Sequence, residues 1–153
     1  MAGLYRLYEE TVMTVGHILS QKGSAVVTAK PVDTVHAVGK VLSTHRVGAV
    51  IVLDGEAIAG IVSERDIVRA IAERGEQALQ LPVAEIMTRN LEVCSPSDTV
   101  LALMNQMTDR RIRHVPVVVD GKLAGIVSIG DVVKHRLAEM EAEARAMRDY
   151  ISA

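Results

Sequence analysis

The chain has 153 residues, 49% hydrophobic and 24% charged, so it is long enough for one domain or for two small domains that share a core. Its formal net charge of −2 gives no general attraction to nucleic acid or to a membrane surface. The sequence has no Phe or Trp, and its three Tyr residues lie near the two ends, so aliphatic side chains and Met must build the core. A flat ligand would therefore lie against aliphatic groups.

The sequence also bears on the location of the protein in the cell. No apolar run is long enough to span a membrane, and the first ten residues lack the basic and apolar regions of a secretory signal. Cys94 is the only cysteine, so no disulfide forms within the chain, which fits a reducing compartment. We therefore expect a cytoplasmic protein without membrane or nucleic-acid partners, in which Cys94 is a half-buried strand residue.

A 65-residue internal repeat organises the chain. When the sequence is shifted by 65 positions, residues 31–69 match 96–134 at 15 of 39 positions without a gap, far more than chance would give. The longest identical run is Ala-Gly-Ile-Val-Ser, which occurs at 59–63 and again at 124–128. The duplication predicts two copies of one structural unit in tandem.

Each copy predicts the same elements in the same order: a leading segment, an extended stretch, a helix, two strands joined by an Asp-Gly turn, and a second helix. In the first copy they fall at 15–19, up to Pro31, 34–45, 48–53 and 57–62, and from Glu64 on. In the second copy they fall at 83–87, up to Pro96, 99–110, 114–119 and 122–127, and from Ile129 on. The expected fold class is therefore α+β or α/β, with two tandem β-α-β-β-α repeats.

The domain organisation follows from the repeat. One such unit has a small sheet with an apolar face that it cannot bury alone, so we expect the two units to pack sheet to sheet as a pseudo-two-fold pair. The boundaries expected are an N-terminal extension over 1–11, a first repeat over 12–74, a linker over 75–81, a second repeat over 82–138 and a C-terminal helical extension over 139–153.

The repeat resembles a known family, the paired cystathionine-β-synthase (CBS) domain or Bateman module. The motifs that carry the resemblance are Gly-Ile-Val-Ser-Glu-Arg-Asp at 60–66, Gly-Ile-Val-Ser-Ile-Gly-Asp at 125–131, Arg-His-Val-Pro-Val at 113–117 and Pro-x-Asp-Thr before each first helix. The resemblance covers about 12–140 and implies a stand-alone CBS pair. Such a pair is a non-catalytic regulatory module that binds adenine nucleotide (AMP, ADP or ATP) in the cleft between its repeats, with no required cofactor and no metal.

The resemblance also implies two sites. In the family the motif Asp holds the ribose hydroxyls and the Ser or Thr helps to hold phosphate, which suits a carboxylate and a helix N-terminus. The first site would contain Ser63 and Asp66, with Arg113, His114 and Lys134 on the phosphate and Val93 and Pro116 against the adenine. The second would contain Ser128, Asp131, Arg69 and Val27. Because the second site has Arg69 as its only basic residue, we expect charged phosphates to bind more tightly at the first.

Other interpretations remain open. Each motif Ser could be only a helix N-cap and each motif Asp only an acidic first-turn residue. The chain could be a structural or protein-interaction module with vestigial pockets, or the same module could bind S-adenosylmethionine or NAD(H). S-adenosylmethionine has no phosphate and would leave Arg113, His114 and Lys134 without a role, which argues against it. The sequence contains no catalytic constellation, so we expect no enzymatic activity.

The C-terminal segment carries a separate pattern. Apolar residues are spaced by 4, 3, 4, 3 and 4 positions, which is a heptad stripe: Val133, Leu137, Met140, Ala144, Met147 and Ile151. The stripe is too short for a stable free-standing coiled coil. It could lie over the module's own surface or pair with a second subunit. We favour pairing, so that helices over 133–151 contribute to a homodimer, which the family resemblance implies to be disc-like. The regulated protein would be a separate, unidentified chain.

Overall fold

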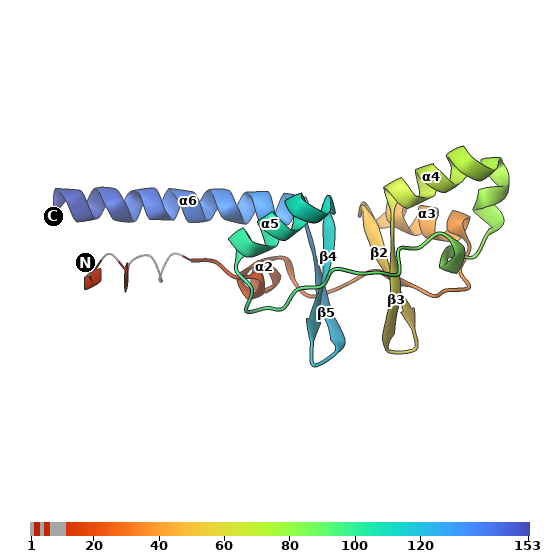
Figure 1. Ribbon diagram of the computed structural model, residues 1–153, viewed down its shortest axis with the longest axis horizontal. Helices are drawn as coiled ribbons and strands as arrows, with labels where there is room; N and C mark the ends of the chain where they lie inside the picture. The colour runs from red at the N-terminus through yellow and green to blue at the C-terminus, as the bar shows by residue number, and fades with distance from the viewer. Residues whose placement is uncertain (1, 4, 7–11) are drawn as a thin grey trace. The chain divides into compact units, whose positions relative to one another are not determined.

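The computed structural model describes residues 2–3, 5–6 and 12–153, so most of the predicted N-terminal extension lies outside the described residues. The chain forms two compact units (Figure 1). Unit 1 contains the described residues up to Ser24 together with Val93–Val119 and Ala124–Ala153. Unit 2 contains Ala25–Glu92 and the short turn Asp120–Leu123.

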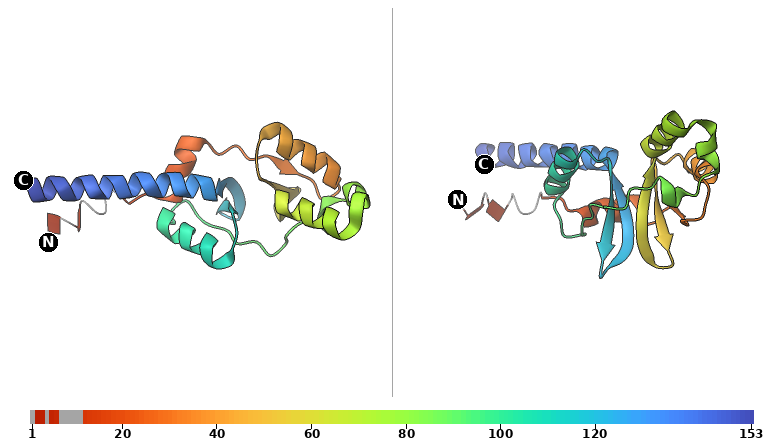
Figure 2. Two further views of the ribbon diagram at one scale, coloured as in Figure 1. Left: turned by 90° about the horizontal axis from the view of Figure 1, so that it is seen from above. Right: turned by 45° about the vertical axis from the view of Figure 1, so that its right-hand side comes forward.

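Unit 2 contains a three-stranded sheet in the order β1-β2-β3, in which β1 runs parallel and β3 antiparallel to β2. Helices α3 and α4 and two short 3-10 helices complete it (Figure 2). In chain order its elements are β1 (Thr28–Ala29), α3 (Val35–His45), β2 (Ala49–Asp54), β3 (Ala57–Ser63), α4 (Glu64–Arg74), η1 (Gly75–Gln80) and η2 (Val83–Glu85).

Unit 1 contains a two-stranded sheet of β4 and β5, and a single bridge between Cys94 and Val117 adds the preceding segment parallel to β4. Its elements are α2 (Val15–Lys22), α5 (Val100–Arg110), β4 (His114–Val119), β5 (Lys122–Ser128) and α6 (Ile129–Ser152). The predicted α+β class with two β-α-β-β-α repeats is thereby confirmed, and the predicted C-terminal extension is the continuation of α6.

Local sequence explains where the first helix of each repeat begins and ends. The Thr34 and Thr99 hydroxyls each accept a hydrogen bond (3.1 Å) from the backbone N–H three residues later, so α3 and α5 start one residue after the cap. Arg46 and Arg111 end these helices in the left-handed conformation, with φ of 52° and 53°. The equivalence of the two copies thus extends to the caps.

One local prediction needs correction. In the first hairpin Asp54 still belongs to β2 and pairs with Ala57, so the turn consists of Gly55 and Glu56 rather than Asp54 and Gly55. The turn keeps its place in the repeat, since residues 55–56 and 120–121 are 65 positions apart, but the Asp-Gly pair lies one residue earlier in the first copy. The segment expected to be a linker also has structure, since its residues 75–80 form η1 and bury Ala78.

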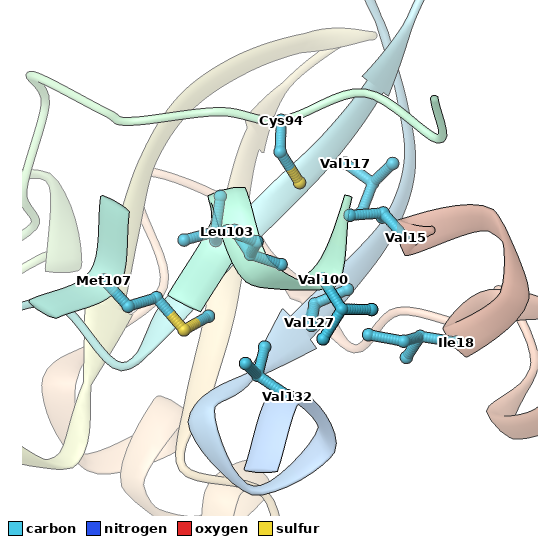
Figure 3. Close-up of a cluster of buried hydrophobic side chains, with 10 residues drawn as sticks. Val15, Ile18, Cys94, Val100, Leu103, Met107, Val117, Val127 and Val132 are labelled. Atoms are coloured by element: carbon cyan, nitrogen blue, oxygen red, sulfur yellow. The ribbon is translucent and has the colours of Figure 1, made fainter. Parts of the chain in front are cut away.

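Each unit has its own aliphatic core, as the absence of Phe and Trp requires. Cys94 is 4% exposed in the core of unit 1 (Figure 3) and is therefore buried, not half-buried as expected, because its segment lies between β4 and α5. The other buried residues of this core are Val15, Ile18, Val100, Leu103, Met107, Val115, Val117, Val127 and Val132. The core of unit 2 contains Ala29, Val35, Val38, Leu42, Val50, Val52, Val62, Val83 and Met87.

The leading segments are exchanged between the repeats. The segment before the first repeat belongs to unit 1, where Val15 N–H donates to the Asp98 carbonyl (2.8 Å). The segment before the second repeat belongs to unit 2, where Val83 N–H donates to the Asp33 carbonyl (2.8 Å). Each compact unit therefore combines the leading segment of one repeat with the strands and helices of the other. The domain boundaries and the sheet-to-sheet packing inferred from the repeat stay predictions.

Candidate functional site

The first motif lies where β3 passes into α4. Ser63 is the N-cap of the helix, and Asp66 is the third residue of its first turn. The Asp66 Oδ2 atom accepts hydrogen bonds from the Ser63 backbone N–H (2.8 Å) and from its hydroxyl (3.1 Å), while Ser63 Oγ accepts one from the Asp66 N–H (3.3 Å). The Asp66 Oδ1 atom lies 3.9 Å from Nη1 of Arg69. The capping box thus occupies one carboxylate oxygen and leaves the other near a mostly exposed guanidinium.

The second motif repeats this geometry where β5 passes into α6. The Asp131 Oδ2 atom accepts from the Ser128 N–H (2.9 Å) and hydroxyl (3.0 Å), and Ser128 Oγ accepts from the Asp131 N–H (3.2 Å). The capping role considered for both serines is therefore real. One contact has no equivalent at the first motif, because the Lys22 ammonium donates to Asp131 Oδ2 at 2.6 Å.

Lys22 determines the protonation of Asp131. Burial of the carboxyl would by itself raise its pKa. Hydrogen bonds from Lys22 and Ser128, together with the positive charge of Lys22, outweigh burial and hold the pKa of Asp131 below its ordinary value. Asp131 is therefore a carboxylate at neutral pH, and part of its hydrogen-bonding capacity is already used.

The two units differ at the position that Lys22 occupies. In unit 1 the ammonium also donates to the Ile126 carbonyl (2.9 Å). The matching carbonyl of unit 2, that of Ile61, instead accepts from the Thr88 backbone N–H (2.9 Å). A backbone bridge in unit 2 thus stands where a lysine stands in unit 1, and among the described residues only the Asp131 motif has a lysine from a leading segment.

Sequence reasoning missed Lys22. The expectation that Arg69 would be the only basic residue of the second site is wrong, because Lys22 contacts Asp131 directly and Arg69 lies beside Asp66. Lys22 lies 109 residues from Asp131 and precedes residues 31–69, the stretch in which the identities of the repeat were found. A lysine followed by Gly23 is typical of a helix C-terminus, which predicts the end of α2 but not the ionic partner.

A second contact joins the same two helices. His135 of α6 is 4% exposed, and its Nε2 atom lies 3.1 Å from Oε1 of Gln21, the neighbour of Lys22. Its Nδ1 atom lies 2.8 Å from the Asp131 carbonyl. The end of α2 is therefore held against the first turns of α6 by adjacent side chains, so the position of Lys22 does not depend on one ion pair.

The remaining predicted residues of the first site lie in unit 1. Arg113 precedes β4, and its carbonyl accepts from the Ile129 N–H (2.8 Å), so its backbone lies beside the start of α6. His114 begins β4, and Pro116 is buried within it. Val93 and Lys134 are exposed. Ser63 and Asp66 belong to unit 2, so the assignment of all seven residues to one site stays a prediction.

The remaining residues of the second site lie in unit 2. Arg69 is an exposed residue of α4, and Val27 is half-buried ahead of β1, where its carbonyl accepts from the Ile51 N–H (3.3 Å). Within its unit the structure brings Ser63, Asp66 and Arg69 together, and in the other unit Ser128 and Asp131. The sharing of Arg69 and Val27 with the Asp131 motif stays a prediction.

The two motifs present groups that can form hydrogen bonds to a polar ligand. Each offers a helix N-terminus, a hydroxyl and a carboxylate, which suit the hydroxyl groups and the phosphate of a nucleotide. Within the described ranges, no group of three His, Cys, Asp or Glu residues is arranged to hold a metal ion. None of the helices in the described residues is long and apolar enough to cross a membrane.

Comparison with known proteins identifies the family. The CBS domain profile matches residues 15–73 and 83–138. The mitochondrial CBS domain-containing protein CBSX3 of Arabidopsis thaliana is 40% identical over 124 residues, which are 78% of this chain and 60% of that protein. This chain therefore spans about three fifths of that relative's length.

Solved structures agree in fold. The CBS-domain protein ATU1752 from Agrobacterium tumefaciens has a TM-score of 0.80 and 44% identity, with 81% of this chain and 99% of that chain covered. The CBS domain pair of protein MJ0100, solved in complex with 5′-methylthioadenosine and S-adenosyl-L-methionine, has a TM-score of 0.72 and 26% identity, with 80% and 94% covered. The predicted resemblance is confirmed: the chain belongs to the CBS domain family and carries two such domains in tandem.

Proposed function

We propose that this chain is a non-catalytic regulatory module whose two Ser-x-x-Asp motifs bind an adenosine-containing ligand, with AMP, ADP or ATP preferred. The observation that carries the proposal is the pair of identical capping boxes, each of which fixes a carboxylate at a helix start through one oxygen. The second oxygen of each carboxylate accepts no hydrogen bond from the described residues, which suits a ribose hydroxyl. The CBS pair of MJ0100 with its two adenosyl ligands supports the ligand class.

Nucleotides rather than S-adenosylmethionine are the preferred ligands because of charge. As ligand contacts, the basic side chains of Arg113, His114 and Lys134 suit a phosphate, which S-adenosylmethionine lacks. Charge-assisted hydrogen bonds from such residues are worth about 1.5–3 kcal/mol each. Occupancy would shift the population of the conformation that a regulated protein recognises. A cytoplasmic location is part of the proposal, although the relative CBSX3 is a mitochondrial protein.

We further propose that the Asp66 motif is the stronger of the two. At Asp131 the Lys22 ammonium lies 2.6 Å from Oδ2 and neutralises much of the negative charge of the carboxylate. At Asp66 the nearest cation is 3.9 Å away, on a side chain that is 67% exposed, so its charge is more distant and better screened by water. The Asp66 carboxylate therefore keeps more of its negative charge for the hydroxyl groups of a ribose.

Calorimetric titration with AMP, ATP and S-adenosylmethionine tests the proposal. Asp66→Asn should weaken nucleotide binding more than Asp131→Asn does. Asp33→Asn is the matched control, because Asp33 accepts a similar backbone hydrogen bond (from Lys30 N–H, 2.8 Å) in unit 2 but lies outside the two Ser-x-x-Asp motifs. Tighter binding of S-adenosylmethionine than of either nucleotide would overturn the phosphate assignment. Absence of binding by all three ligands would favour the interaction-module interpretation.

A further inference from the structure

The C-terminal part of α6 carries an apolar stripe that the described residues of its own unit leave exposed. Six of the twelve large hydrophobic side chains exposed in the described part of the chain lie on this helix. Leu137 is 56% and Ile151 is 74% exposed. The opposite face of α6 is the packed one, since Val132, His135 and Glu139 are buried. Figure 1 shows α6 continuing far beyond the strands of its unit.

The stripe has the spacing of a coiled-coil seam. With Leu137, Ala144 and Ile151 at a positions, the d positions are Val133, Met140 and Met147. The CBS domain match ends at residue 138, so Met140 and all later seam positions lie beyond it. The seam is therefore a feature of this chain in addition to its two CBS domains.

The charges beside the seam specify an orientation. Position g of one helix meets position e of the next heptad on a parallel partner. In this chain, Arg136 (g) would meet Glu141 (e) of a second copy, and Glu143 (g) would meet Arg148 (e). Both pairs have opposite charges, and the two-fold symmetry of a homodimer forms each pair twice. Within its own helix Arg136 also contacts Glu139 (3.2 Å) and Glu143 (3.4 Å), so the inter-chain contacts would add to an existing cluster of charges.

An antiparallel partner with the same full overlap gives the opposite result. In that arrangement g positions meet g positions and e positions meet e positions. Glu143 would then meet Glu143 of the second copy, Glu141 would meet Glu141, and Lys134 would meet Arg148. These are like-charge pairs, so the antiparallel arrangement is disfavoured.

We propose that the apolar stripe of α6 pairs with the same stripe of a second copy of this chain, as a parallel, in-register two-stranded coiled coil. The length of the seam is modest, so the rest of the chain stabilises each helix before it pairs, as the packing of Val132, His135 and Glu139 provides. The pairing would join two modules along α6, the helix that begins with the Asp131 motif, and it does not depend on the identity of their ligand.

Disulfide cross-linking under mild oxidation tests the orientation. Ile151→Cys places a thiol at the end of the seam, where only a parallel partner brings the two copies of residue 151 together. Asp149→Cys, at the outward-facing f position, is the matched control, and the native Cys94 is buried. A covalent dimer of Ile151→Cys but not of Asp149→Cys is expected. An Ile151→Cys variant that stays monomeric, or that cross-links no more than the control, overturns the proposal.

Charge reversal gives a second, independent readout. Glu143→Lys and Arg148→Glu should each weaken the homodimer by about tenfold in sedimentation experiments, because each replaces attractive pairs with like charges. Mixing the two variants should restore association as a heterodimer, since all four pairs again have opposite charges. Asp149→Lys is the control, with a charge change equal to that of Glu143→Lys. Stronger association of Arg148→Glu alone would instead indicate the antiparallel arrangement and overturn the proposal.

Discussion

The ammonium of Lys22 lies 2.6 Å from Oδ2 of Asp131, so that the end of α2 is joined by an ion pair to the first turn of α6. The two side chains are 31% and 23% exposed, so water screens the pair only in part. The contact links the leading segment of the first repeat to the motif of the second. It is the largest difference between two motifs whose capping geometry is otherwise the same.

Removal of this cation should destabilise the protein. Lys22→Met keeps the aliphatic stem but leaves the Asp131 carboxylate without its strongest donor, so the free energy of unfolding should fall by about 1–2 kcal/mol at neutral pH. Chemical denaturation measures the change. Lys40→Met, which alters an exposed lysine of α3, should leave stability nearly unchanged. Equal losses in the two variants would show that the pair contributes nothing specific.

The contribution of the pair should depend on pH in a defined direction. Because the pKa of Asp131 is depressed in the folded state, its stabilisation is complete above the ordinary Asp value of about 3.9 and is lost as the pH falls toward the lower folded value. The stability difference between wild type and Lys22→Met should therefore be constant near neutral pH and shrink below about pH 4. A difference that persists unchanged in acid would exclude ionised Asp131 as its source.

The two motif glycines should differ in their tolerance of a methyl group. A Cβ at Gly60 would lie 2.8 Å from the backbone oxygen of Thr88, which cannot move without breaking the bridge to Ile61. A Cβ at Gly125 would lie 2.7 Å from Cδ2 of Leu19, the end of a flexible side chain. Gly60→Ala should thus cost about 2–3 kcal/mol and Gly125→Ala about 1 kcal/mol in urea denaturation. The reverse order would contradict this explanation.

Cys94 should be inert in the native protein. Burial raises the pKa of its thiol to about 12, with a further contribution from the nearby charge of Asp98. A thiol-reactive dye should therefore label native protein very slowly at mildly alkaline pH and react fully after denaturation. Rapid labelling of the native state would mean that the segment carrying Cys94 opens readily from β4.

Arg136 should be important for the folded state because of Glu139. The Glu139 side chain is 3% exposed, and one of its oxygens lies 3.2 Å from Nη1 of Arg136. Arg136→Met would leave a buried carboxylate without a cation and should cost about 3 kcal/mol. Adding Glu139→Gln should recover part of the loss, since the amide needs no counter-charge, and thermal unfolding of single and double variants measures this. Additive losses would show that the two residues act independently.

Much of the fold could be predicted because its signals are local. Thr34 and Thr99 cap their helices through contacts within three residues, and the strands follow from short β-branched runs. The duplication then predicted that what holds for the first copy holds for the second. The repeat therefore gave two independent sequences from which to predict each helix and strand.

The parts that could not be predicted depend on contacts between distant segments. Cys94 belongs to a short extended stretch whose burial is decided by β4, with which it shares one bridge. Lys22 reaches Asp131 only because the leading segment of the first repeat joins unit 1. Neither contact could be predicted from the 65-residue repeat. The repeat shows which residues of the two copies are equivalent, but it does not show which copy provides the residues that pack against a given position.

The exchange of leading segments has a consequence for how such a chain could arise. In this chain, the leading segment of each repeat packs against the strands of the other repeat. In a polypeptide with one repeat the leading segment would have no such partner, and the core would lack the residues equivalent to Val15 and Ile18. Two such polypeptides would complete one another only by reciprocal exchange, as in a domain-swapped pair. Joining the copies in tandem turns that exchange into an intramolecular step, so folding no longer depends on protein concentration. Gene duplication with fusion would thus have removed a concentration limit on folding.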